Sequence, residues 1–387
     1  MSTGEFGVGS LACFSSLDQV GEGTYGYVYR GTDKRNGNVV ALKRLLFHRE
    51  NAGFPLSAVR EIKFLKSLQH KNIILLKDVV SSKGCEHIEK CLRTDTNRTE
   101  ERGEKPDATE SSDHTRNALR EWGNLYLVFE YVEHDLGGLI DAKYSFSTRE
   151  VKCIARQLLD VLDYLSEKKI LHRDIKSSNI LLTNRHQVKL ADFGLARSIL
   201  SSDGRELRQD LTNNVVTMWY KPPELLLGAT RYNYAVDLWS TACVLAELEL
   251  GRPLFPGRTE VEQLDFISKA LGTPTADSCG DLKNLPNYDM LRNLPRVSNT
   301  LRTSYYGKLS DMSINLLERV LVFDPSRRAS AKILLSHQYF TTQPLPPMEP
   351  TDLEPMRIDP GVSYHEYRTK QLKRQRENAP ERIETAP

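Results

Sequence analysis

The residues best suited to catalyse a reaction lie in one short stretch, His172-Arg-Asp-Ile-Lys-Ser-Ser-Asn179. The triplet Asp192-Phe-Gly follows it. Asp174 can accept a proton from an attacking hydroxyl, and Lys176 can neutralise a transferring phosphoryl group. Asn179 and Asp192 supply oxygen donors of the kind that magnesium prefers. In this order and at this spacing, the residues predict phosphoryl-transfer chemistry.

Two features upstream of this loop fit the same chemistry. The stretch Gly21-Glu-Gly-Thr-Tyr-Gly26 is followed by strand residues, which argues against a dinucleotide-binding turn. Its glycines let backbone amides approach phosphate oxygens, although an ordinary hairpin explains the stretch alone equally well. Lys43 ends an apolar strand, and Glu61 lies on the apolar face of a helix. Because a buried lysine needs an anion, we expect a Lys43–Glu61 pair that faces phosphates, rather than two solvated rim charges.

The elements that must position these residues fall into two groups. Strand-like residues over 17–45 are broken by glycines and by the Asn36-Gly-Asn38 turn signal, and 125–129 is a further strand. Apolar spacing predicts a helix over 57–69. Further helical stripes lie at 151–165, 235–250, 260–271, 310–321 and 329–336. The pattern predicts an α+β chain with a small β-rich lobe, a larger helical lobe and a ligand cleft as the default site.

Composition excludes several classes of protein. The 387 residues carry a net charge of +2, so no direct nucleic-acid binding is expected. Six scattered cysteines do not form a secreted disulfide framework. Residues 1–14 lack a signal peptide pattern, and no apolar run approaches the roughly 18 residues of a membrane span. We therefore expect an intracellular, soluble chain that does not enter a membrane.

Residues 83–122 form a polar insertion. They include 18 charged residues out of 40 and few bulky apolar ones, so we expect this insertion to be largely disordered. Cys85, His87 and Cys91 leave a zinc site open as an alternative, although no fourth ligand stands at motif spacing.

The ends of the chain also differ in composition. Residues after Phe340 are rich in proline, and the basic stretch 368–376 predicts a short helix. We expect a flexible N-terminus over 1–13, a catalytic domain over 14–340 with lobes at 14–132 and 133–340, and a C-terminal tail over 341–387.

The residues above resemble the eukaryotic protein kinase family over roughly 14–340, which implies the bilobal kinase fold with one regulatory helix. The sequence Pro-Leu-Ser-Ala-Val-Arg-Glu over 55–61 is similar to the helix signature of cyclin-dependent kinases. Residues 126–136 resemble the transcription-elongation branch of that family. Residues 211–224 match its activation segment, and 365–376 resemble the C-terminal extension of the branch.

The resemblance implies ATP and Mg²⁺ as cofactors. Lys43 then binds the ATP phosphates with Glu61 as its partner, and Asp174 is the catalytic base. Asn179 and Asp192 carry the magnesium. The residues implied to bind ATP are Val20, Gly21, Glu22, Gly23, Thr24, Tyr25, Gly26, Val28, Ala41, Lys43, Phe129, Glu130, Tyr131, Val132, Asp135, Leu181 and Asp192.

Several of these residues have an implied place around the nucleotide. Val28, Ala41 and Leu181 would sandwich the adenine. Glu130 to Val132 would supply hinge hydrogen bonds, and Asp135 would line the ribose side.

Thr212 matches the activating phosphorylation site of the family. A phosphothreonine adds negative charge and three acceptor oxygens, which need guanidinium donors to order a loop. By the resemblance these donors are Arg60, Arg173 and Arg197, and another kinase phosphorylates Thr212.

By the resemblance, Val216 lies at the position where kinases of this family offer no hydrogen-bond acceptor to the backbone N–H of the substrate residue after the phosphorylated one. This favours proline, which has no amide proton, after the phosphorylated residue. Thr24 and Tyr25 match inhibitory phosphorylation sites of cell-cycle members, and their use here stays open. Lys221 replaces the usual arginine, a departure expected to loosen the segment.

The resemblance implies a cyclin-dependent, proline-directed serine/threonine kinase in the nucleus, or otherwise in the cytoplasm, with a cyclin as its partner. The implied substrate is the heptad tail of RNA polymerase II. A cell-cycle or mitogen-activated kinase and a pseudokinase scaffold are the alternatives. The segment lacks the T-x-Y pair of mitogen-activated kinases, and every catalytic position is occupied.

Overall fold

The computed structural model forms two compact units, with residues 1–67 and 74–132 in the first and residues 68–73 and 133–387 in the second. The structure describes residues 9–23, 26–45, 56–82, 124–199, 210–212, 215–275, 278–359 and 361–377. The predicted insertion 83–122, with its alternative zinc ligands, lies outside the described residues. No helix in these described ranges is long and apolar enough to cross a membrane.

The first unit contains a six-stranded sheet in the order β1-β5-β6-β4-β3-β2. Its strands are β1 (Gly9–Ser10), β2 (Phe14–Gly23), β3 (Gly26–Asp33), β4 (Val39–Leu45), β5 (Leu76–Ser81) and β6 (Leu125–Glu130). At the end of β2, Gly23 pairs with Gly26 of β3. Between β3 and β4, Gly37 has a φ of +73°, which suits glycine in a turn. The predicted hairpins are therefore confirmed.

Residues 9–13 differ from the expected flexible N-terminus. Gly9 and Ser10 pair in parallel with Val80 and Ser81, and a 3₁₀ turn follows over Leu11–Cys13. Leu11 and Cys13 pack against the apolar cluster of the sheet, which orders this short polar lead-in.

The helix of the first unit, α1 (Leu56–Ser67), follows the predicted 57–69 pattern and lies against β5. Ala58, Glu61 and Leu65 are its buried residues. These positions share one face of a helix with a 3.6-residue period. Glu61 is therefore directed inward by the same periodicity that buries its apolar neighbours.

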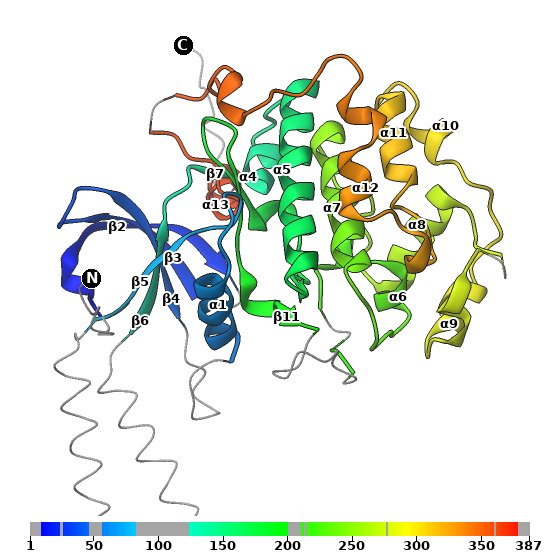
Figure 1. The fold of residues 1–387 in the computed structure, drawn as a ribbon, viewed down its shortest axis with the longest axis horizontal. Coiled ribbons are helices and arrows are strands. Elements are labelled where there is room, and N and C mark those ends of the chain that lie inside the picture. The colour runs from blue at the N-terminus through cyan, green and yellow to red at the C-terminus, as the bar shows by residue number, and fades with distance from the viewer. Residues whose placement is uncertain are drawn as a thin grey trace, which may run out of the picture. The chain divides into compact units, whose positions relative to one another are not determined.

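The second unit is mainly helical. Its helices are α4 (Leu136–Asp141), α5 (Thr148–Glu167), α6 (Pro223–Leu226), α7 (Ala235–Leu250), α8 (Glu260–Leu271), α9 (Tyr288–Arg292), α10 (Leu301–Tyr305), α11 (Asp311–Glu318), α12 (Ala331–Leu335) and α13 (Glu366–Glu377). Its short strands are β7 (His134–Asp135), β8 (Ile170–Leu171), β9 (Ile180–Leu182), β10 (Val188–Leu190) and β11 (Arg197–Ser198). Helix α7 lies beside α5 (Figure 1). Nearly all residues of α7 are buried. This helix therefore forms much of the buried interior of the second unit.

The segment expected to be a C-terminal tail packs onto the second unit. Lys152 donates to the carbonyl of Thr342 at 2.8 Å, and Arg156 to that of Pro347 at 3.0 Å. Met356 is buried. The predicted basic helix is α13, which lies against α4 (Figure 1).

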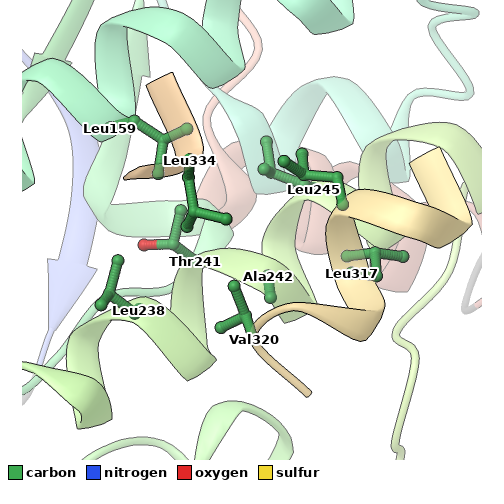
Figure 2. Close-up of a pocket in the computed structure, with 9 residues that line it drawn as sticks. Leu159, Leu238, Thr241, Ala242, Leu245, Leu317, Val320 and Leu334 are labelled. Atoms are coloured by element: carbon green, nitrogen blue, oxygen red, sulfur yellow. The ribbon is translucent and has the colours of Figure 1, made fainter. Parts of the chain in front are cut away.

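An apolar pocket lies between α5, α7, α11 and α12 (Figure 2). Eight aliphatic residues and Thr241 line it: Leu159, Leu238, Ala242, Leu245, Leu316, Leu317, Val320 and Leu334. The buried hydroxyl of Thr241 has no hydrogen-bond partner among the described residues. An unsatisfied buried hydroxyl is costly.

We predict that Thr241→Val stabilises the protein by about 1–3 kcal/mol, because it removes this unsatisfied group and preserves side-chain shape. Ser240→Ala is the matched control, since Ser240 Oγ lies 2.8 Å from the carbonyl oxygen of Tyr220 and donates to it. The control should lower the thermal midpoint. A lower midpoint for Thr241→Val than for wild type would contradict the prediction.

Candidate functional site

The start of the loop 172–179 is hydrogen-bonded to the side chain of Asp237 on α7. The two oxygens of this buried carboxylate accept the backbone N–H groups of His172 and Arg173, each at 2.8 Å. Burial raises the pKa of Asp237, whereas the two backbone N–H groups and the charge of Arg173 oppose that rise. Arg173 has a φ of +67°, an uncommon conformation that surrounding contacts must maintain. The loop therefore has a fixed backbone.

The carboxylate of Asp174 has three side-chain partners. Lys176 Nζ lies 2.8 Å from Oδ2, and Asn179 Nδ2 donates to the same oxygen at 2.9 Å. Thr217 Oγ1 donates to Oδ1 at 3.1 Å. The structure thus brings Asp174, Lys176 and Asn179 together, as their spacing predicts. Sequence reasoning did not assign a role to Thr217, which lies 43 positions away.

Asn179 and Asp192 carry the oxygen atoms expected of the implied magnesium ligands. The amide nitrogen of Asn179 bonds to the backbone oxygen and Oδ2 of Asp174, so its other terminal atom is an acceptor oxygen. Ala191, next to Asp192, donates its N–H to the Asn179 carbonyl at 2.9 Å, which links the two segments. No cluster of three His, Cys, Asp or Glu side chains suited to a metal occurs in the described ranges. The remaining ligands would come from phosphate and water, as is usual for Mg²⁺.

In the first unit, Lys43 and Glu61 form the predicted pair. Lys43 Nζ lies 2.8 Å and 3.0 Å from the two Glu61 carboxylate oxygens. Both side chains are largely buried, with 13% and 4% exposed. The pairing confirms the geometric prediction from β4 and α1.

The glycine-rich stretch lies on the β2–β3 hairpin. Gly26 has a φ of +151°, and a Cβ there would lie 1.8 Å from the carbonyl oxygen of Arg44. Only glycine fits at this position. Gly21 pairs with Val28, and Glu22 with Tyr27. Thr24 and Tyr25 lie outside the described residues.

The predicted adenine-contacting residues are divided between the two units. Val20, Phe129 and Val132 are buried in the first unit. Ala41 pairs with Phe129 across β4 and β6. Glu130, expected in the hinge, donates its backbone N–H to Leu75 and accepts the Leu75 N–H with its carboxylate. Tyr131 follows in the first unit, where Arg30 lies over its ring.

Asp135 and Leu181 are neighbours in the second unit, where β7 pairs with β9. Asp135 Oδ1 accepts the N–H of Gly138 at 2.7 Å and thereby caps α4. Its Oδ2 accepts the N–H of Glu366 at 3.0 Å and lies 3.3 Å from His365 Nδ1. The carboxylate expected beside the ribose therefore also holds the C-terminal segment.

The predicted activation residues of the second unit meet around Tyr232. Its hydroxyl donates to the carbonyl of Thr212 at 2.6 Å and accepts from Arg173 Nη1 at 3.0 Å. Burial raises the pKa of Tyr232, and Arg173 and Arg197 oppose that rise. Thr212 is exposed. Arg60 belongs to α1 of the first unit, and sequence reasoning did not identify Tyr232.

Residues 215–224 have several contacts within the second unit. Val216 is buried and has a φ of +67°, a strained conformation for a β-branched residue. Lys221 is buried, with Nζ 3.5 Å from Glu260 Oε1. Glu224 and Arg328 form a buried bidentate pair at 2.6 and 2.7 Å. Lys221 and Glu224 thus each have a charged partner within the second unit, and the loosening expected from Lys221 stays a prediction.

Comparisons with known proteins agree with this arrangement. The chain is 40% identical over 366 residues to cyclin-dependent kinase C-2 of Arabidopsis thaliana, which covers 94% of this chain and 65% of that protein. It is 37% identical over 364 residues to CTD kinase subunit alpha of Schizosaccharomyces pombe, covering 94% and 54%. It is 37% identical over 367 residues to cyclin-dependent kinase 12 of Caenorhabditis elegans, covering 94% and 45%.

The chain thus spans just under two thirds, or less, of the length of these relatives. The family description "Protein kinase domain" matches residues 14–340. That range contains both the Lys43–Glu61 pair and the Asp174 cluster. The chain therefore belongs to the protein kinase family.

Proposed function

We propose that this chain is a cyclin-dependent serine/threonine kinase that transfers the γ-phosphate of ATP to Ser-Pro or Thr-Pro sites. The observation that carries the proposal is the carboxylate of Asp174, bonded by Lys176, Asn179 and Thr217. A carboxylate fixed in this way can accept the proton of a substrate hydroxyl while the adjacent lysine neutralises transferred charge.

The other residues have matching roles. Lys43, which pairs with Glu61, would bind the ATP phosphates, and Asn179 with Asp192 would hold Mg²⁺. When bound there, Mg²⁺ would neutralise part of the phosphate charge. Lys176 Nζ lies 2.8 Å from Asp174 Oδ2, so the proposed base has a cation beside it.

The proposal includes two partners that control activity. Leu56 and Val59 on α1 are 71% and 44% exposed, an apolar surface that a cyclin would cover. An activating kinase would phosphorylate Thr212, and Arg60, Arg173 and Arg197 would bind the added phosphate.

The proposed substrate is the heptad tail of RNA polymerase II, and the proposed location is the nucleus. Support comes from the resemblance to CTD kinase subunit alpha and to cyclin-dependent kinase 12. The left-handed backbone of Val216 supports the preference for proline. In the family this position contacts the substrate residue after the phosphorylated one, and a strained backbone often marks such a functional site.

We predict phosphate transfer from ATP to a heptad-repeat peptide when the chain is bound to its cyclin. Asp174→Asn should lower kcat by about 10²–10⁴-fold, because it removes the general base. The chain without cyclin should be nearly inactive. No transfer by the cyclin-bound, Thr212-phosphorylated wild type would support the scaffold alternative, and equal rates with and without cyclin would refute the dependence.

We predict that Thr217→Val lowers kcat by about tenfold, because Asp174 loses a hydrogen bond that orients it. Thr217→Ser keeps the hydroxyl and is the matched control. Steady-state kinetics with the same peptide measure both variants. Equal kcat values for the valine and serine variants would show that the Thr217 hydroxyl does not orient the base.

We predict that wild-type kcat/KM for a Ser-Pro peptide exceeds that for a Ser-Ala peptide by about 5- to 100-fold, since alanine leaves an unpaired N–H. Val216→Gly should reduce this ratio, because glycine lets the backbone leave the left-handed region. Val215→Ala, at the adjacent buried position, should keep it. A ratio unchanged by Val216→Gly would remove Val216 from proline selection.

A further inference from the structure

Three buried side chains of the second unit form a hydrogen-bonded row. The Ser177 and Tyr220 hydroxyls lie 2.9 Å apart. The Tyr220 hydroxyl donates to Glu247 Oε2 at 2.8 Å. Each residue is at most 6% exposed, so bulk water does not replace these bonds. Glu247 lies on α7 and has no assigned part in the chemistry described above.

The row connects two segments that are already joined at the reacting carboxylate. Ser177 lies three residues after Asp174, and Tyr220 lies three residues after Thr217. The Thr217–Asp174 bond and the Ser177–Tyr220 bond therefore link the same two segments at two points. Two hydrogen bonds between the same two segments fix the orientation of one segment relative to the other as well as the distance between them.

Helix α7 supports both ends of this arrangement. Asp237 holds the start of the catalytic loop, and Glu247 stands ten positions later, about 15 Å along the helix. Ser240, between them, donates to the carbonyl of Tyr220 at 2.8 Å. The segment 217–220 is thus attached to α7 by its backbone and by the Tyr220 side chain.

We propose that Glu247 is a positioning residue for phosphoryl transfer, which acts through Tyr220 and Ser177 to hold the substrate-side segment 217–220 against the catalytic loop. This inference rests on the proposed kinase function. Its consequence is that the charge on Glu247 sets how tightly Asp174 is oriented.

The surroundings of Glu247 make that charge variable near neutral pH. Burial raises the pKa of Glu247 to about 7, and bonds from Tyr220 and Ser177 oppose the rise. The charges of Glu366 on α13 and Asp141 on α4 raise it further.

Two further groups belong to these surroundings. Lys370 pairs with Glu366 and moderates its charge. The Cys243 thiol lies on α7 itself, where burial raises its pKa and leaves it neutral.

The sign of the effect follows from the hydrogen bond. A carboxylate accepts a stronger bond from Tyr220 than a neutral acid does, so the row is tighter above the pKa of Glu247. Turnover should rise with pH through about 7. Stability should change in the opposite direction. Because the folded pKa lies above the unfolded value, the contribution of this group is full below about 4.5 and is lost as pH rises toward about 7.

The test compares pH–rate profiles of wild type and Glu247→Gln, each as the full chain bound to its cyclin. Wild-type kcat should rise through about pH 7, whereas Glu247→Gln should lack this rise and be about three- to tenfold slower at the alkaline end. KM for ATP should not change. The thermal midpoint of Glu247→Gln should increase relative to wild type as pH rises, so lower activity would accompany higher stability.

Glu249→Gln is the matched control. Glu249 lies on the same helix, is partly buried, and accepts a hydrogen bond from Ser313 of α11 at 2.6 Å; burial raises its pKa as well. This variant should keep the wild-type rise. Tyr220→Phe should reproduce the loss in Glu247→Gln, and the double variant should lose no more than the larger single loss.

The outcomes separate the two proposals. If the wild type is active and Glu247→Gln leaves its pH profile unchanged, the positioning role alone is overturned. The same holds if Glu249→Gln abolishes the rise of kcat with pH as fully as Glu247→Gln does. A cyclin-bound wild type without activity overturns the proposed kinase function instead.

Discussion

The catalytic loop depends on one buried carboxylate. Asp237 accepts the N–H groups of His172 and Arg173 at 2.8 Å each, and its burial shields both bonds from bulk water. Loss of this acceptor would leave two buried donors unpaired, which costs about 1–3 kcal/mol for each. The left-handed backbone of Arg173 is maintained by the same contacts. The next residue is Asp174, so the position of the reacting carboxylate follows from a support in the helical core.

The parts of the site that the sequence predicted are those encoded by local spacing. Lys43 and Glu61 follow from an apolar strand and an apolar helix face, and the bends at Gly26 and Gly37 follow from backbone conformations that suit glycine. Thr217 lies in the matched stretch 211–224, where it had no assigned role, although its hydroxyl reaches a carboxylate 43 positions earlier. Tyr232 and the Tyr220–Glu247 contact were missed for the same reason. Which polar side chains meet across a fold depends on tertiary packing, and periodicity does not report it.

The C-terminal segment shows the limit of composition as a guide. Its proline spacing and basic helix indicated a tail, yet its attachment depends on backbone groups that composition does not reveal. Asp135 donates its N–H to the carbonyl of Tyr364 at 3.0 Å and accepts the N–H of Glu366. A Cβ on Gly138 would lie 2.5 Å from the same Tyr364 oxygen. A glycine in α4 therefore permits the close approach, and the packed unit extends beyond residue 340.

The two buried carboxylates at either end of α7 differ in the donors that they meet. Backbone N–H groups only donate, so Asp237 must remain an acceptor for the loop to keep its shape. The partners of Glu247 are hydroxyls, which both donate and accept. If Glu247 gains a proton, Tyr220 can accept from it and donate to Ser177, so the row persists with its direction reversed. Burial raises the pKa of both carboxyls, but only the environment of Glu247 accommodates either protonation state. Asp237 is thus a fixed support, whereas Glu247 is an adjustable one.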